Sequence, residues 1–138
     1  MKKEVLIRKK EKQNFLICIK KERFMRNRNS HSVTFKKKLN KCNRIFRAYN
    51  ELQLKYGDVL EANEDIIEIN FNVLLKDFEL GDSFTSDFVC TKKDGSLMVR
   101  ECVFKKNLLK PSTVKMLDAS HNYWSNRDVS DWGIVLDV

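Results

Sequence analysis

Residues 84–105 read FTSDFVCTKKDGSLMVRECVFK. Two runs rich in Val, Phe, Thr and Leu flank Asp94-Gly95, and glycine accepts the positive φ that a tight reversal of the chain requires. The stretch therefore predicts a β-hairpin with one carboxylate in each strand, Asp87 in the first and Glu101 in the second.

The length of the hairpin loop decides whether the two carboxylates face each other, because a shift of one residue moves every side chain to the other face. A two-residue loop would place Asp87 opposite Cys102. A three-residue loop over residues 93–95 places Asp87 opposite Glu101. We favour the three-residue loop, because Lys-Asp-Gly puts glycine at the position that needs a left-handed conformation.

Directly opposed cross-strand residues have Cβ atoms about 5 Å apart. Two carboxylates at that separation repel each other unless a cation, a proton or a basic side chain lies between them. In the favoured register, Asp87 and Glu101 therefore predict a site for a divalent metal ion. We expect Mg²⁺, with Mn²⁺ as a substitute, because carboxylate oxygens without nearby cysteine or histidine suit a hard cation.

The chain has 138 residues, which is the length of one domain with a substantial core. No apolar run approaches the roughly 20 residues of a membrane span, and the basic beginning of the chain lacks an apolar signal core. We expect a soluble cytoplasmic protein without a membrane partner. The four cysteines show no metal-ligand spacing, so we expect reduced thiols and no disulfide.

Charge is distributed unevenly along the chain. Residues 1–47 hold 17 basic and three acidic residues, a net charge of +14, whereas residues 48–138 hold 10 basic and 16 acidic residues, a net charge of −6. We therefore divide the chain into a basic N-terminal arm or extension (1–47) and a core domain (48–138). A basic arm indicates a polyanionic partner, most simply double-stranded DNA held through its phosphates, although a solvated tail has the same composition.

The segments around the hairpin predict a mixed fold. We expect a helix over 48–62, a half-buried strand over 66–75, a helix over 112–126 that starts after Pro111, and a last strand from Asp131. Residues 35–47 fit an exposed basic arm with roughly helical spacing, and residues 15–19 fit either a short strand or one turn of helix. This order indicates an α/β fold near the α+β boundary, with helices flanking a mixed sheet.

An Asp on the second strand and a Glu on the third, within this order of elements, resemble the restriction-endonuclease-like PD-(D/E)xK nuclease fold. More specifically, residues 44–138 resemble the TnsA family, the endonuclease subunits of heteromeric cut-and-paste transposases. The matching segments are Phe46-Arg47, Glu51-Leu52-Gln53, Leu60-Glu61, Thr85-Ser86-Asp87-Phe88, Val99-Arg100-Glu101-Cys102, Lys115, Tyr123-Trp124 and Asp131-Trp132-Gly133-Ile134-Val135.

The resemblance implies a Mg²⁺-dependent DNA endonuclease that cuts transposon ends together with a transposase subunit and an ATPase regulator. Carried over to this chain, Asp87 is the central metal ligand and Glu101 the second. The family also uses a helix carboxylate. We assign this carboxylate to Glu51, with Glu61 as the alternative. The register of the helix is open, because extending the match without gaps from Leu60-Glu61 places Gln53 at that position.

One residue departs from the family pattern, because Val103 occupies the position of the lysine in the (E/Q)xK motif. Alternation along a strand places residues 101, 103 and 105 on one face, so we assign the catalytic lysine to Lys105 rather than to Arg100, which points to the other face. Two alternatives stay open. In place of the transposase subunit, the chain would be a catalytically silent DNA-binding or assembly module of the same fold, or a stand-alone restriction-type nuclease.

Overall fold

The fold was analysed in a computed structural model that describes residues 4–8, 15–19 and 34–138. Its elements in chain order are β1 (Glu4–Arg8), β2 (Phe15–Ile19), β3 (Phe35–Lys37), β4 (Phe46–Ala48), α1 (Glu51–Ala62), β5 (Ile66–Leu74), β6 (Thr85–Lys92), β7 (Leu97–Val103), the short 3-10 helix η1 (Lys105–Asn107), α2 (Pro111–Ser125) and β8 (Asp131–Asp137). From α1 onward this is the predicted order of a helix, three strands, a helix and a strand. Residues 15–19 form a strand rather than a helical turn.

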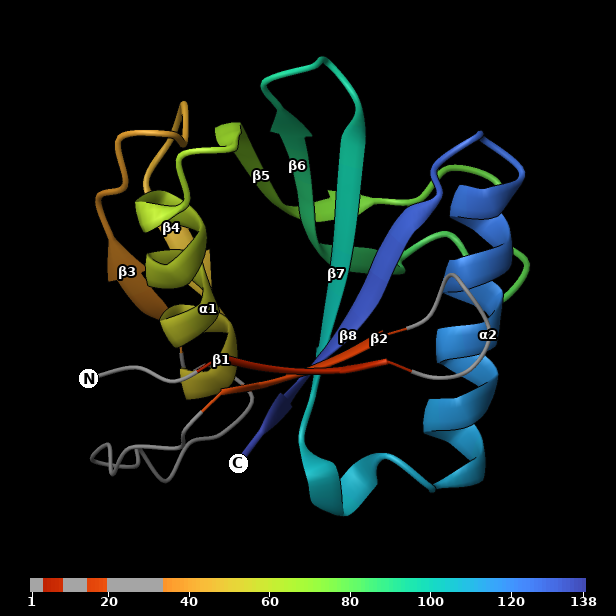
Figure 1. Cartoon of the computed structure of the whole chain (residues 1–138). Helices are drawn as coiled ribbons and strands as arrows, with labels where there is room; N and C mark the ends of the chain where they lie inside the picture. The colour runs from red at the N-terminus through yellow and green to blue at the C-terminus, as the bar shows by residue number, and fades with distance from the viewer. Residues whose placement is uncertain (1–3, 9–14, 20–33) are drawn as a thin grey trace.

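One mixed sheet organises these elements, with the strand order β1-β2-β8-β7-β6-β5 (Figure 1). The strands β5, β6 and β7 form an antiparallel meander, and β8 lies parallel to β7 because α2 carries the chain back across the sheet. The strand β2 continues the sheet parallel to β8, and β1 pairs with β2 in the antiparallel sense. The prediction of an α/β fold with a mixed sheet is confirmed.

The hairpin between β6 and β7 has the predicted three-residue loop. The backbone N–H of Lys92 donates to the carbonyl of Ser96 at 2.9 Å, which closes the ladder around residues 93–95. Gly95 has a φ of 86°, the left-handed conformation that the loop requires. The register that places Asp87 opposite Glu101 therefore follows from the turn.

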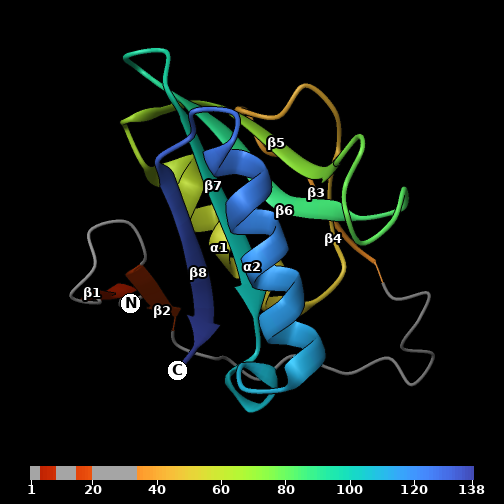
Figure 2. The same ribbon diagram turned by 90° about the vertical axis from the view of Figure 1, so that its right-hand side faces the viewer.

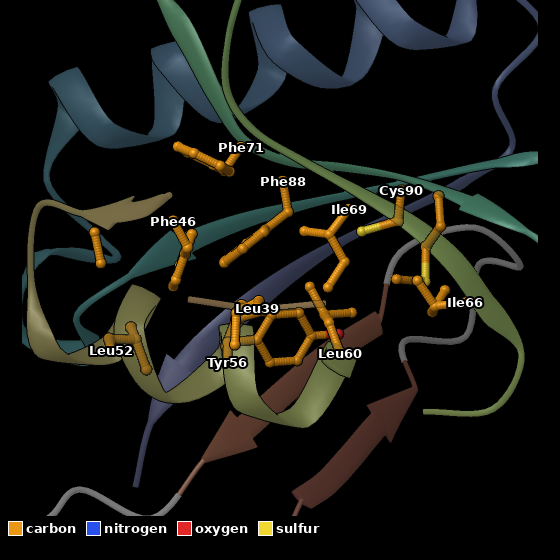
Figure 3. Packing of buried hydrophobic residues seen from close by; sticks show 13 residues of the cluster. Leu39, Phe46, Leu52, Tyr56, Leu60, Ile66, Ile69, Phe71, Phe88 and Cys90 are labelled. Carbon is orange, nitrogen blue, oxygen red and sulfur yellow. The ribbon is translucent and has the colours of Figure 1, made fainter. Parts of the chain in front are cut away.

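The two helices cover opposite faces of the sheet (Figure 2). An apolar cluster between α1 and the sheet contains large side chains from α1, β4, β5 and β6 (Figure 3), namely Phe46, Leu52, Tyr56, Leu60, Ile66, Ile69, Phe71 and Phe88 among others. A second cluster under α2 contains Leu75, Phe78, Val89, Val99, Val103, Leu117, Trp124, Trp132 and Leu136 among others. The strands β6 and β7 contribute to both clusters, so their side chains are enclosed on both faces.

The helix α1 begins at a capped residue. The side-chain oxygen of Asn50 accepts a hydrogen bond from the backbone N–H of Gln53 at 2.9 Å, and Asn50 itself is extended. Such a cap satisfies one of the backbone N–H groups that the first turn of a helix leaves unpaired. The helix therefore starts at Glu51, three residues later than the sequence indicates.

Residues 35–48 form a two-stranded ribbon of β3 and β4 rather than an arm with helical spacing. Phe46 and Ala48 of β4 are completely buried, and the Phe46 ring packs edge-on against Phe71 with centroids 5.1 Å apart. The apolar residues at alternate positions of β4 decide this outcome, because burying them on α1 requires an extended chain. The ribbon is thus part of the core packing.

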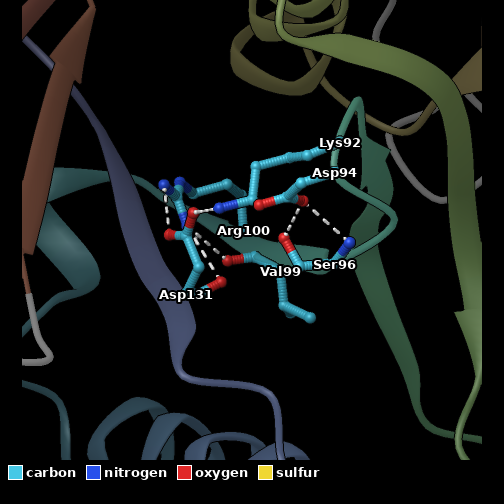
Figure 4. Close-up of polar contacts among 6 residues, drawn as sticks. All are labelled: Lys92, Asp94, Ser96, Val99, Arg100 and Asp131. Atoms are coloured by element: carbon cyan, nitrogen blue, oxygen red, sulfur yellow. Dashed lines mark hydrogen bonds and ion pairs between the residues drawn. The ribbon is translucent and has the colours of Figure 1, made fainter.

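An ion cluster joins the hairpin to β8 (Figure 4). The guanidinium of Arg100 lies 2.8 Å from one oxygen of Asp131, and the ammonium of Lys92 lies 2.9 Å from the other. Arg100 is 4% exposed, whereas the Asp131 side chain is 24% exposed, so breaking the pair would remove the carboxylate that compensates a buried guanidinium. Arg100 therefore links β7 to Asp131 of β8, and its backbone position is next to that of Glu101.

Gly57 provides a test of the packing between α1 and the ribbon. A Cβ at this position would lie 2.5 Å from Cε2 of the buried Phe46 ring. Alanine inside a helix is ordinarily more favourable than glycine by about 1 kcal/mol, but this overlap reverses the effect. We expect Gly57→Ala to lower the free energy of unfolding by about 1–3 kcal/mol in urea denaturation.

The control for Gly57→Ala is Asn122→Ala, at an exposed position of α2. This substitution shortens an exposed side chain and should change the free energy of unfolding by less than about 0.7 kcal/mol. An increase in stability for Gly57→Ala would contradict the packing described.

Candidate functional site

The two predicted carboxylates come together where β6 begins and β7 ends. The last backbone pair of the ladder is Phe88 opposite Arg100, so Asp87 and Glu101 occupy the next opposed positions. Beyond that pair, hydrogen bonds from backbone N–H groups to the two carboxylates take the place of the backbone–backbone hydrogen bonds of the ladder. The backbone N–H of Asp87 donates to Oε1 of Glu101 at 2.9 Å, and the backbone N–H of Cys102 donates to Oδ2 of Asp87 at 2.7 Å.

Glu101 is 2% exposed and lies at the centre of a buried hydrogen-bond network. The hydroxyls of Ser86 and Ser120 both donate to its Oε2 atom, at 2.8 and 2.5 Å. Each hydroxyl in turn accepts an indole N–H, from Trp124 at 2.9 Å and from Trp132 at 3.1 Å. Because the indoles occupy the acceptor side of each hydroxyl, both hydroxyl protons are directed to the carboxylate.

The surroundings raise the pKa of both carboxyl groups. Burial and the nearby charge of Glu101 raise the pKa of Asp87 to about 8, against the lowering effect of the Cys102 N–H. Burial also raises the pKa of Glu101, although the hydrogen bonds from Ser120, Asp87 and Ser86 oppose that shift. Two carboxylates in such surroundings are stable only when a proton or a cation compensates their charge.

The geometry of the pair fits a hard divalent cation. Oδ1 of Asp87 accepts no hydrogen bond from the residues that the structure describes, and Oε1 of Glu101 accepts only the Asp87 N–H. Each carboxylate therefore keeps acceptor capacity on one oxygen, and Asp87 is only partly buried. Mg²⁺ commonly takes one or two carboxylates and keeps several waters, so two ligands suffice for it.

The helix carboxylates do not join this pair. Within the described residues, no group of three or more Asp, Glu, His or Cys side chains is arranged to hold a metal ion. The residue of α1 that reaches the site is Gln53, and Glu51 lies two positions earlier, about 200° away around the helix axis. The alternative, Glu61, accepts the backbone N–H groups of Asn40 and Lys41 at the far end of α1. The assignment of a third metal ligand to Glu51 or Glu61 therefore lacks support in the geometry.

Gln53 is 1% exposed and connects α1 to the site. Its amide nitrogen donates to Oδ1 of Asn72 at 2.8 Å and to the carbonyl of Asp87 at 3.4 Å, and its oxygen accepts the backbone N–H of Tyr49 at 2.9 Å. Gln53 is also the residue that the ungapped extension of the family resemblance from Leu60-Glu61 places at the position of the helix carboxylate.

The reason for choosing Lys105 is wrong. The strand β7 ends at Val103, and Lys105 begins η1, so the alternation along a strand does not extend to it. Lys105 is exposed, and its backbone N–H donates to the carboxylate of Asp137. Val103, at the motif position of the lysine, is 6% exposed within the apolar cluster under α2. The described contacts therefore bring no lysine to the pair.

Sequence reasoning assigned no site role to Ser86, Ser120, Trp124, Trp132 and Asn72, although Ser86, Trp124 and Trp132 lie in the segments that carry the resemblance. Ser120 had a detectable signal, because it follows Leu117 by three positions and precedes Trp124 by four on the apolar stripe of α2. A serine on a buried stripe needs a hydrogen-bond partner, which here is Glu101. Asn72 had no such signal, since its role depends on a left-handed φ of 49° within β5.

No protein-family model matches the chain, and a search of curated proteins also finds no match. Among the described residues, no helix is long and apolar enough to cross a membrane.

The raised pKa of Asp87 predicts how stability depends on pH. The folded state holds the proton up to about pH 8, whereas the ordinary pKa of Asp is 3.8, so between these values the folded state binds more protons than the unfolded state. Stability contributed by this proton is present at low pH and is lost as the pH rises towards 8. In urea denaturation without divalent cations, we expect the free energy of unfolding of the wild type to fall across this range relative to Asp87→Asn.

Asp118→Asn is the matched control, because Asp118 is an exposed carboxylate of α2. Its pH dependence should follow that of the wild type. The interpretation fails if wild type and Asp87→Asn show parallel curves from pH 4 to pH 8, within about 0.5 kcal/mol.

Proposed function

We propose that the chain is a DNA endonuclease subunit of a heteromeric cut-and-paste transposase, which hydrolyses phosphodiester bonds at transposon ends with Mg²⁺. The observation that carries the proposal is the pairing of Asp87 and Glu101 at opposed positions of neighbouring strands. The antiparallel meander β5-β6-β7 with a parallel β8 supports the proposed nuclease fold. A transposase subunit and an ATPase regulator are the proposed partners.

In this proposal the residues around the carboxylate pair have separate roles. Asp87 and Glu101 hold the cation, and the serine and tryptophan network fixes the Glu101 carboxylate in one orientation. The chemistry that such a cation supplies is activation of water and neutralisation of the charge that grows on the phosphate. Gln53 holds the backbone of Asp87, which sets the position of the carboxylate relative to α1.

A second candidate is a catalytically silent DNA-binding or assembly module of the same fold. Two observations favour it. Val103 is buried where the family motif has a lysine, and Gln53, a neutral residue, occupies the helix position beside Asp87. In this case the carboxylate pair holds a proton or a structural cation.

Calorimetry with Mg²⁺ or Mn²⁺ tests the cation site directly. At a pH above the Asp87 pKa of about 8, we expect the wild type to bind with measurable heat and Asp87→Asn to lose that heat. Loss of one of the two carboxylate ligands should weaken binding of the cation at least about tenfold. Asp118→Asn should bind as the wild type does.

Nicking of supercoiled plasmid with Mn²⁺, in the presence of the partner transposase, separates the two candidates. Cleavage by the wild type that is lost in Asp87→Asn and retained in Asp118→Asn supports the endonuclease. Cation binding without any cleavage supports the silent module. Absence of cation binding in the wild type, or equal binding in Asp87→Asn, contradicts the cation site in both.

A further inference from the structure

The ribbon of β3 and β4 has an outer face that is basic. In its antiparallel register Lys36 lies directly opposite Arg47, and both side chains are exposed. Directly opposed residues have Cβ atoms about 4.5–5.5 Å apart, and two like charges at such positions destabilise the pair of strands. The ribbon therefore carries an unfavourable feature that an anion between the two cations would remove.

Two neighbouring cations, Lys37 of β3 and Arg44 before β4, have partners within the protein. Lys37, on the inner face of the ribbon, forms an ion pair with Asp58 of α1 at 2.6 Å. The guanidinium of Arg44 lies 4.0 Å from the centre of the Phe71 ring and donates to the Phe71 carbonyl at 3.1 Å. Among the described residues, no acidic side chain pairs with Lys36 or Arg47. The outer pair is thus the part of the ribbon that is left for an external anion.

Large exposed side chains flank Arg47 just outside the two ends of β4. Ile45 and Tyr49, two positions before and after Arg47, are 48% and 58% exposed. The buried Phe46 and Ala48 alternate with them. An aromatic and an aliphatic side chain beside two cations present both apolar and charged groups, which suits a surface that follows the sugar-phosphate backbone.

The ribbon is joined to the carboxylate pair by a short chain of hydrogen bonds. The carbonyl of Arg47 accepts a hydrogen bond from the amide nitrogen of Asn72 at 3.0 Å. Asn72 accepts from Gln53 at 2.8 Å, and Gln53 also donates to the carbonyl of Asp87 at 3.4 Å. Asn72 has a left-handed backbone conformation within β5, and its side chain contacts both Gln53 and the Arg47 carbonyl. The backbone of Arg47 is therefore held at a fixed position relative to Asp87.

We propose that the outer face of the β3–β4 ribbon binds the phosphate backbone of duplex DNA through Lys36 and Arg47 and positions it relative to the Asp87–Glu101 pair. The inference rests on the proposed function, because it assumes DNA as the substrate. The inference adds a surface that holds the DNA substrate. This surface, the outer face of the ribbon, carries no catalytic group of its own. Two-stranded ribbons are an established way to contact a DNA groove and its phosphates.

Fluorescence anisotropy with a short labelled duplex of mixed sequence, measured over a series of salt concentrations, tests the ribbon. Each lost phosphate contact lowers the slope of log affinity against log salt by about 0.9. We expect the double variant K36Q/R47Q of the full chain to bind at least about tenfold more weakly than the wild type, with a slope smaller by about two. The variant K93Q removes one charge from the exposed hairpin loop and should bind as the wild type does.

The variant K36E separates binding from folding. It places an acid opposite Arg47, so the cross-strand pair becomes attractive and the melting temperature should rise or stay unchanged. DNA affinity should nevertheless fall at least about tenfold. A stabilised variant with weakened binding cannot be explained by damage to the fold.

The outcomes distinguish the inference from the proposed function. Wild-type affinity and slope in K36Q/R47Q overturn the ribbon surface and leave DNA binding in place. A wild type that does not bind the duplex at all overturns both. Equal weakening by the single-charge variants K93Q and K36Q also overturns the ribbon surface, because it shows that only net charge matters.

Discussion

Two carboxylates at opposed positions of neighbouring strands, Glu101 buried and Asp87 partly buried, are the constraint on which the rest of the structure depends. Asp87 and Glu101 would separate β6 from β7 if both were charged and unsupported, because like charges repel strongly away from water. The structure opposes this with donors, since each strand gives a backbone N–H to the carboxylate of the other. The pair thereby closes the end of the hairpin where the backbone ladder stops.

The second layer of support comes from both helices. From the α2 side, Ser120 holds Glu101, and Trp132 of β8 orients the serine hydroxyl. From the α1 side, Gln53 holds the backbone of Asp87. A change in either helix therefore reaches the carboxylates through one or two side chains. Such fixed surroundings are what a cation site or a catalytic group requires, because ligands that are held in place lose little freedom on binding.

Much of the fold follows from local chemistry that the sequence displays. The loop Lys93-Asp94-Gly95 determines the register of the hairpin, because a single glycine supplies the left-handed position. That register predicts the facing of Asp87 and Glu101, which the structure confirms. Pro111 likewise marks the start of α2.

The parts that could not be predicted depend on contacts between distant segments. Alternation places Lys105 beside Glu101 only if β7 continues, and the strand instead ends at Val103, two residues after Glu101. Residues 35–48 show basic residues at helical spacing, but burial of Phe46 on α1 gives a strand. The role of Gln53 depends on Asn72, which is 19 residues away in the chain and adopts a conformation that is uncommon outside glycine.

The most direct test of the carboxylate site is the location of a bound metal ion by anomalous X-ray scattering. Crystals of the wild type would be soaked in Mn²⁺ at a pH above the Asp87 pKa of about 8. The account predicts an anomalous peak in contact with carboxylate oxygens of both Asp87 and Glu101, at about 2.2 Å, and no peak there in Asp87→Asn. A fully occupied Mn²⁺ elsewhere in the protein, with none between these two residues, would contradict it.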